Sequence, residues 1–141
     1  MPKKTTTTKT LSREERRDLD IEIGFLEGVV RRDPQFEEAL QVLGDDYTAR
    51  GRVNEGLHVD EQLAQLRPED PLVFYNLACS YALIKEYEKA VKTLDRAMDL
   101  GYRDFHWLAR DEDLRELRKH PLFKPVRERI KKLKTGKSAQ K

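Results

Sequence analysis

The sequence repeats itself at an offset of 34 residues, and this period constrains the fold more than any other feature. Four residues recur unchanged at that offset: Leu43 as Leu77, Tyr47 as Tyr81, Leu66 as Leu100 and Asp70 as Asp104. Small and apolar residues also recur in kind: Gly44 as Ala78, Gly56 as Ala90, Leu40 as Phe74, Val53 as Tyr87 and Leu57 as Val91. A fixed period of this length predicts two stacked copies of one structural unit.

The pattern within and around the two copies is helical. Ser12 and Glu15 have the spacing of a capping box, which predicts that a first helix starts there. Proline and glycine then separate apolar stripes of helical spacing, so we expect helices over residues 12–33, 34–49, 53–66, 72–84 and 87–100. No run of β-branched residues alternates with polar ones, so strands are not expected. The small residues at Gly44, Gly56, Ala78 and Ala90 predict close helix packing, because only small side chains let two helices approach closely.

These residues resemble the tetratricopeptide repeat family. The first unit supplies Leu40, Leu43, Gly44, Tyr47, Gly56 and Pro68, and the second supplies Phe74, Leu77, Ala78, Tyr81, Ala90 and Leu94. The resemblance covers residues 37–104 and implies an all-α fold, a right-handed α-α superhelix of two helix pairs. Two positions depart from the family pattern: Asp60 replaces an aromatic, which suggests a looser or more solvated contact, and Tyr102 replaces the final proline. The N-terminal helix resembles the second helix of a unit whose first helix is missing.

The period fails beyond Tyr102, so a different segment follows the repeats. Residues 104–123 resemble a terminal segment found after the repeats in bacterial proteins of this family. The resemblance rests on an aromatic pair and on Asp111, Asp113, Leu114, Leu117, Arg118, Pro121 and Phe123. We expect short helical turns up to Lys119 and then a last helix whose Val126, Ile130 and Leu133 cover the end of the stack. Trp107 is expected to anchor this cap. The predicted domain is therefore 12–134, with repeats 37–70 and 71–104 and the cap 105–134, between disordered tails 1–11 and 135–141.

Charge is distributed unevenly along the chain. Eight lysines lie in acid-free stretches at the two ends: Lys3, Lys4, Lys9, Lys131, Lys132, Lys134, Lys137 and Lys141. The other 20 of the 28 basic residues face all 26 acids, so the middle is about 6 negative. Such a core argues against nucleic-acid binding except through the tails. The single Cys79 cannot form an internal disulfide, and no stretch reads as a signal peptide or membrane span, so we expect a cytoplasmic protein.

The resemblance implies a binding site on the concave face, where this family holds extended or helical segments of partners. The corresponding residues are Glu38, Gln41, Asp45 and Thr48 in the first unit, and Leu72, Tyr75, Asn76, Cys79 and Leu83 in the second. This half-polar, half-apolar surface suits an unidentified protein or peptide with basic and apolar anchors. In the alternative arrangement, the chain's own ends cover Leu72, Tyr75 and Leu83 and make them core.

Other functional classes fit the sequence less well. The carboxylate clamp that some family members use is rejected, because Gln41 and His106 replace its lysines and Asp45 replaces an asparagine. The three histidines are separated by helices, and the acids at 111–113 suit a helical first turn, so we expect no catalytic residue, cofactor, metal or small-molecule substrate. The alternative function is self-association as a homodimer through the helix face that carries Gly24 and Gly28.

Overall fold

The structure, a computed structural model, describes residues 10–136, and within this range it is all-helical. Eight α-helices and two short 3-10 helices make up this part of the chain, and it contains no strand. In chain order they are α1 (Arg13–Arg32), α2 (Glu37–Ala49), α3 (Val53–Leu66), α4 (Pro71–Leu83), α5 (Tyr87–Asp99), α6 (Phe105–Leu108), η1 (Glu112–Leu114), α7 (Arg115–Lys119), η2 (Pro121–Phe123) and α8 (Lys124–Thr135). The predicted all-α class is therefore confirmed.

Local signals set most helix ends. The Ser12 hydroxyl accepts from the Glu15 amide at 3.0 Å, and the Ser12 amide donates to the Glu15 carboxylate at 2.9 Å, which completes the predicted capping box. Asp70 caps α4 in the same sense, because its carboxylate accepts from the Leu72 amide at 2.9 Å. Gly101 follows α5 with a φ of +113°, a conformation that favours glycine.

The start of α2 differs from the prediction. The sequence predicted a helix from residue 34, but α2 begins at Glu37 and Phe36 occupies the N-cap without a side-chain hydrogen bond. Asp33 instead ends α1, since its amide donates to the Val29 carbonyl at 2.9 Å. Its carbonyl then accepts from the Phe36 amide at 3.1 Å, so residues 33–36 form a turn.

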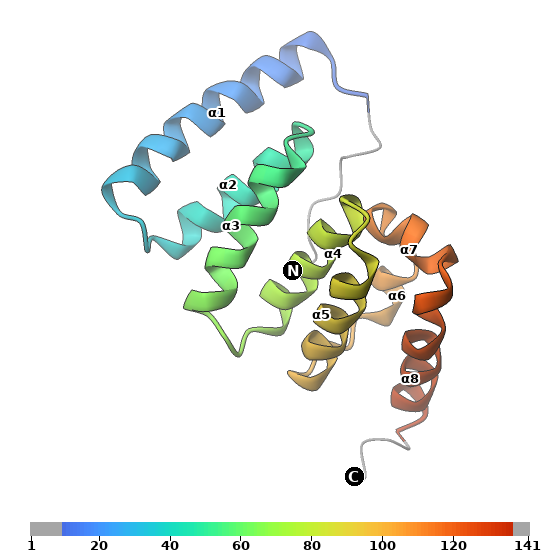
Figure 1. Ribbon diagram of the computed structural model, residues 1–141. Helices are drawn as coiled ribbons and strands as arrows, with labels where there is room; N and C mark the ends of the chain where they lie inside the picture. Colours follow the sequence, from blue (N-terminus) through green and yellow to red (C-terminus); the bar gives the residue numbers. More distant parts are fainter. Residues whose placement is uncertain (1–9, 137–141) are drawn as a thin grey trace.

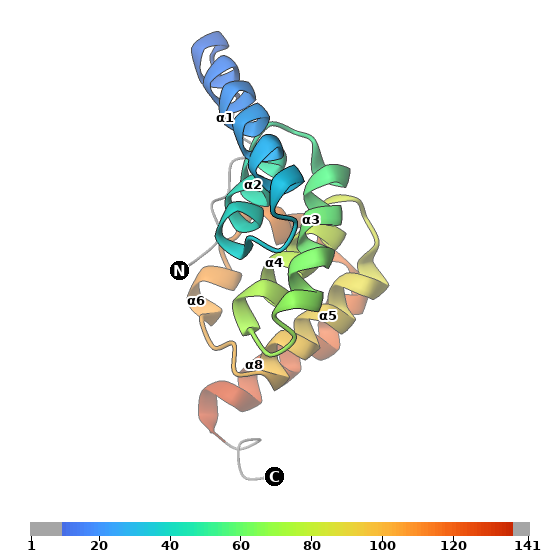
Figure 2. The ribbon, with the colours of Figure 1, turned by 90° about the vertical axis from the view of Figure 1, so that its left-hand side faces the viewer.

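Consecutive helices pack side by side from α1 to α5, and α6, η1, α7, η2 and α8 follow at the far end (Figures 1 and 2). The 34-residue period recurs in the contacts. The Tyr47 hydroxyl donates to Glu27 on α1 at 2.5 Å, and the Tyr81 hydroxyl donates to Glu61 on α3 at 2.9 Å. Each pair spans 20 residues, so the second contact is the first one displaced by one period.

Small residues allow close approach inside the helix pairs, as predicted. A Cβ added at Gly56 on α3 would lie 2.7 Å from the Thr48 hydroxyl oxygen of α2, and one at Gly44 would lie 3.1 Å from an Asp60 oxygen. Ala78 and Ala90 are completely buried in the second pair. Interiors pack at near-crystalline density, so these positions leave no room for a larger side chain.

Asp60 does not make the solvated contact that its place in the repeat suggested. The side chain is buried, at 5% exposure, and one carboxylate oxygen accepts a hydrogen bond from the Ser80 hydroxyl at 2.5 Å. Ser80 lies on α4, so this bond ties the first helix pair to the second. A buried carboxylate needs such a donor, because burying charge without hydrogen bonds is costly.

The last helix covers the end of the stack, as predicted. Val126 of α8 is buried, and Ile130 and Leu133 pack against the same core as Leu94 and Met98 of α5. The helix continues to Thr135 and ends at Gly136, whose φ is +78°, so it extends slightly beyond the predicted domain end at residue 134. The predicted tails fall largely on residues 1–9 and 137–141, which lie outside the described residues.

Candidate partner-binding surfaces

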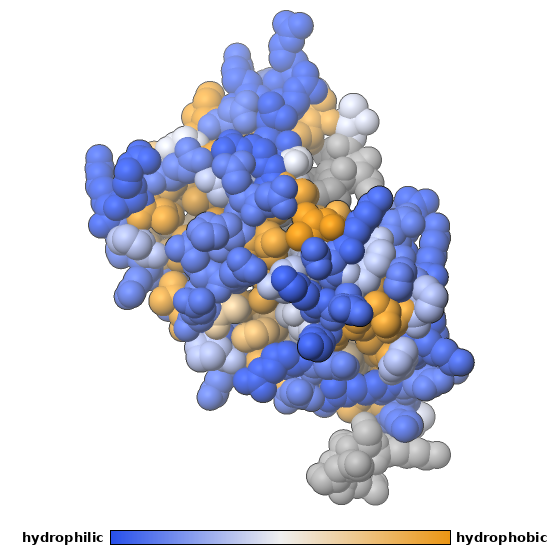
Figure 3. Space-filling view, viewed as in Figure 1, coloured by the Kyte–Doolittle hydropathy of each residue, from blue (hydrophilic) through white to orange (hydrophobic). Residues whose placement is uncertain are grey.

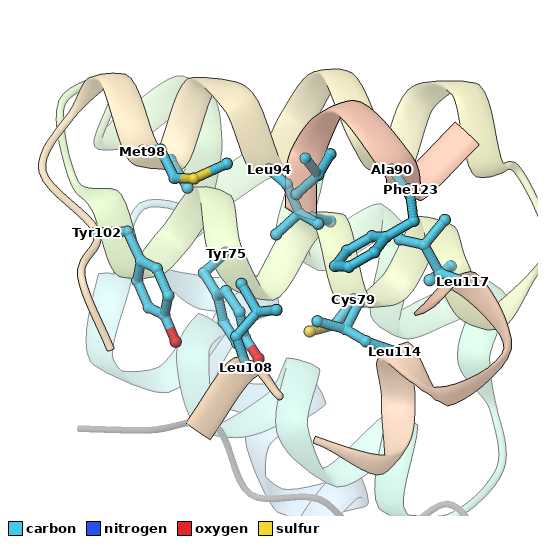
Figure 4. Close-up of a cluster of buried hydrophobic side chains, with 14 of the residues drawn as sticks. Tyr75, Cys79, Ala90, Leu94, Met98, Tyr102, Leu108, Leu114, Leu117 and Phe123 are labelled. Carbon is cyan, nitrogen blue, oxygen red and sulfur yellow. The ribbon is translucent and has the colours of Figure 1, made fainter. Parts of the chain in front are cut away.

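The C-terminal segment covers the centre of the α4 half of the predicted concave face, at Tyr75 and Cys79. Tyr75 and Cys79 are both 0% exposed, among Leu108, Leu114 and Leu117 from the segment after α5 (Figure 4). Both residues were predicted to contact a partner, and that prediction is wrong for this arrangement. Of the three residues in the alternative arrangement, Tyr75 is part of the core beneath the chain's own end, whereas Leu72 and Leu83 are half-buried.

Tyr75 holds this cover in place through its ring and its hydroxyl. The ring stacks on Tyr102 with centroids 4.4 Å apart and planes 8° from parallel, and the hydroxyl donates to Asp111 at 2.6 Å. The Cys79 thiol lies 3.6 Å from the same carboxylate oxygen. Burial raises the pKa of Tyr75 well above its usual value, so the phenol stays a neutral donor.

The covering segment is also fastened to itself. The second oxygen of Asp111 accepts from the Asp113 amide at 3.0 Å, which caps η1 as the acid-rich sequence predicted. The Arg118 guanidinium donates to the carbonyls of Leu108 at 2.9 Å and Asp111 at 2.7 Å. The covering segment is therefore held by hydrogen bonds within itself as well as by its contacts with α4.

The uncovered part of the predicted face lies on α2. Glu38 is exposed, Gln41 and Asp45 are half-buried, and between them Val42 is 42% exposed. Thr48, also predicted to contact a partner, is buried against Gly56. On α4, Leu72, Asn76 and Leu83 are half-buried. The open surface is therefore shorter and more acidic than the sequence implied.

A second candidate surface is a hollow of about 610 Å³ between α1, α2 and α3. Apolar atoms show between α1 and α3 in Figure 3. Leu40, Leu43 and Val59 form the floor, and polar side chains ring it: Glu27, Arg31, Asn54, Glu55, His58 and Gln62. Its size falls in the range of ordinary ligand pockets.

The same place one period later is bridged by the chain itself. Leu40 and Gln62, which line the hollow, correspond to Phe74 and Arg96. The Arg96 guanidinium carbon lies 5.8 Å from the centre of the Phe74 ring, so these two side chains meet across that position. The repeat pattern did not lead us to predict the hollow. The one sequence signal for the hollow was that Leu40 and Gln62 are smaller than Phe74 and Arg96, their counterparts one period later.

Charges at the rim of the hollow are largely balanced. Arg52 makes two hydrogen bonds with Glu55, at 2.6 and 2.7 Å, and lies 3.7 Å from Glu27. Its guanidinium also lies 4.8 Å from the centre of the Tyr47 ring. Burial, followed by the hydrogen bond to Glu27, raises the pKa of Tyr47 to about 12. Hydrogen bonds therefore hold Glu27, Tyr47 and Glu55 at the rim of the hollow.

Several side chains of the kinds that bind metals or catalyse reactions lie in the described chain. The fold brings ligand-type atoms of Cys79, Asp111 and Asp113 within 4.8 Å of one another, although no local spacing in the sequence suggested it. The hydrogen bonds of Tyr75 and η1 account for this arrangement. His58 lines the hollow, His106 lies 2.6 Å from Arg110, and His120 packs on Tyr87.

Within residues 10–136, no helix has the length and apolar character to span a membrane.

Comparison with known proteins adds one relationship. No protein-family model matches the chain, and no solved structure matches it. The chain is similar to a protein of Arabidopsis thaliana whose name describes it as chloroplastic, with 29% identity over 99 residues. That match covers 68% of this chain and 28% of the plant protein, so the chain spans well under half of its relative's length.

Proposed function

We propose that the protein is a cytoplasmic adaptor of the tetratricopeptide type, which holds a segment of another protein on its helical stack. The 34-residue period, the paired Tyr–Glu contacts and the small residues inside the helix pairs support this assignment. A right-handed superhelix of two units is the arrangement that the assignment implies. The proposal includes no catalysis, because its surfaces offer shape and hydrogen bonds rather than a reacting group.

The hollow between α1, α2 and α3 is the observation that carries the proposal. It has an apolar floor of Leu40, Leu43 and Val59, the kind of surface that accepts an apolar side chain. At the corresponding place in the second unit, the Arg96 guanidinium lies over the Phe74 ring. A partner side chain entering the hollow would therefore complete a packing arrangement that the chain already makes once.

The exposed part of α2 is a second candidate surface for the same function. Val42 lies beside Glu38 and Asp45, so a segment with an apolar and a basic side chain fits it. This keeps the predicted partner chemistry but moves the contacts away from Tyr75 and Cys79. The two surfaces use different sides of α2, because Leu40 and Leu43 line the hollow whereas Glu38 and Val42 do not.

Filling the hollow tests the proposal. We propose the double substitution Leu40→Phe with Gln62→Arg, which copies the Phe74 and Arg96 arrangement into the first unit. Proteins captured from cells by the full-length chain should be lost from this variant and identified by quantitative mass spectrometry. Gln65→Arg is the matched control, since it adds the same charge to an exposed position of α3 outside the hollow.

The outcome also separates the two surfaces. Circular dichroism and thermal unfolding must first show that each variant is folded. Loss of captured proteins in the filled variant but not in Val42→Glu assigns binding to the hollow. The reverse pattern assigns it to the exposed face of α2. Equal capture by the wild type and both variants would show that neither surface binds the partner.

A further inference from the structure

The first helix has two apolar faces, and only one of them is used within the described chain. Ile23 is buried against α2, and Leu26 and Val30 pack beside it. On the opposite side of α1, Ile21 is 64% exposed and Phe25 is 69% exposed, the highest values among the large exposed hydrophobic side chains. Figure 3 shows apolar surface over α1. Adjacent exposed apolar side chains on one helix face indicate a contact surface.

The outer face has the periodicity of a helix seam. Residues at alternating spacings of four and three run along it: Glu14, Asp18, Ile21, Phe25, Gly28 and Arg32. This is the spacing of the two core positions in a heptad, whose residues face a partner helix. The described chain leaves room for one, since a Cβ added at Gly24 meets nothing within 4 Å and one at Gly28 meets only Arg31, at 3.8 Å.

We propose that this face pairs with the same face of a second copy, with the two α1 helices antiparallel about a two-fold axis near residue 23. In this register Ile21 packs on Phe25 of the other copy, at the centre of the seam. Asp18 then lies opposite Gly28, and Glu14 lies opposite Arg32, at each end. The seam is therefore self-complementary in charge, as a two-fold interface requires. A parallel pair would instead place Glu14 on Glu14 and Arg32 on Arg32.

The expected dimer is weak and depends on protein concentration. A helix of 20 residues is about 30 Å long, and a single helix face buries less area than the roughly 1,200 Å² typical of stable interfaces. Glu22, also exposed, flanks the proposed axis, so its two copies repel each other across the pair. Glu22→Gln should therefore tighten the dimer.

Sedimentation of the full-length protein, from micromolar to millimolar concentration, tests the pairing. Phe25→Glu should weaken the dimer roughly a hundredfold or more, because it removes two buried rings and adds two charges. Val42→Glu is the matched control, since Val42 is an exposed apolar residue on α2 and should leave the dimer unchanged. A monomer at every concentration, or a dimer that survives Phe25→Glu, would overturn the proposal.

Charge reversal tests the antiparallel register. Glu14→Arg alone, or Arg32→Glu alone, should weaken the dimer by about threefold to tenfold, because each places like charges together at both ends of the seam. The double variant Glu14→Arg with Arg32→Glu should recover wild-type affinity. In a parallel pair each single variant would only replace one like-charge pair with another and would leave the affinity nearly unchanged, and that result would reject the proposed register. Unchanged circular dichroism establishes that all of these surface variants are folded.

Discussion

Gly56 lies where α3 packs tightly against α2, and a side chain larger than hydrogen does not fit there without a shift. A Cβ there would stand 2.7 Å from the Thr48 hydroxyl oxygen and 3.3 Å from the Gly44 carbonyl. We predict that Gly56→Ala lowers the free energy of unfolding by about 1–3 kcal/mol, because crowding outweighs the gain in helix propensity. Urea unfolding measures this change.

Gly24→Ala is the control for that prediction, since the added methyl group at Gly24 meets no atom within 4 Å. At dilute concentration it should raise stability by up to about 1 kcal/mol, as expected for an exposed helical position. If both alanines had the same effect, the close approach at Gly56 would contribute nothing to stability.

Asp60 illustrates why single buried residues resist prediction from a repeat. Its counterpart one period later is Leu94, so the repeat indicated only that a polar side chain stands where the second unit has an apolar one. The donor that satisfies it, Ser80, lies 20 residues away on another helix. Ser80 itself corresponds to Asp46, so the repeat gave no indication of a matched pair. Such pairs depend on tertiary contacts that periodicity does not encode.

Helix limits were predictable wherever the signal is local. Ser12 with Glu15, and Asp70 with Pro71, predicted the starts of α1 and α4 because a cap is made within one turn of the chain. The start of α2 was not predicted correctly. Asp33 is a residue type that favours the N-cap, but its backbone amide hydrogen-bonds to Val29 at the end of α1.

The contact between α4 and η1 depends on one buried phenol. We predict that Tyr75→Phe lowers the free energy of unfolding by about 1–3 kcal/mol, because the buried Asp111 carboxylate loses a donor 2.6 Å away. Urea unfolding is again the measurement, with hydrogen exchange at the Asp113 amide reporting on the local cap.

Tyr81→Phe provides the matched comparison for Tyr75→Phe. Its hydroxyl donates to Glu61 at 2.9 Å in a part-buried setting, where water can replace the lost donor. We expect it to cost less than about 1 kcal/mol. Equal costs for the two variants would contradict the view that burial sets the strength of the Tyr75 contact.

The sequence could not decide whether the α4 face is open. The capping segment and its acids were predictable from the sequence, and Tyr102 stood out as a departure from the family pattern. The sequence offered no means of seeing that Tyr102 stacks on Tyr75, because the two residues come from different elements. Covered and open faces use the same apolar residues, so their composition alone does not distinguish them.

Tyrosine ionisation should limit the stability of the whole molecule at high pH. Burial raises the pKa of Tyr47 and Tyr81 to about 12 and raises those of Tyr75 and Tyr102 above their usual value. A folded state that holds these protons more tightly keeps their full stabilising contribution below about pH 10, the value for an unfolded chain. That contribution is lost as the pH rises through the folded-state values.

Urea midpoints measured from neutral pH to about pH 12 test this dependence. The double variant Tyr47→Phe with Tyr81→Phe should start less stable but lose stability less steeply, because two of the titrating phenols are gone. Tyrosinate absorbance should rise together with unfolding. A wild-type curve with the same slope as the variant would show that these tyrosines do not govern alkaline unfolding.

The two ends of the stack differ, and the difference limits how such a protein can be lengthened. After α5, the chain is closed by Asp111, Arg118 and the apolar side of α8, so inserting a helix pair there would require dismantling that network. Before α1, the outer surface that carries Ile21 and Phe25 is still accessible. A designer adding modules should therefore build outward from the amino-terminal side, where the new material would shield the exposed side chains of Ile21 and Phe25.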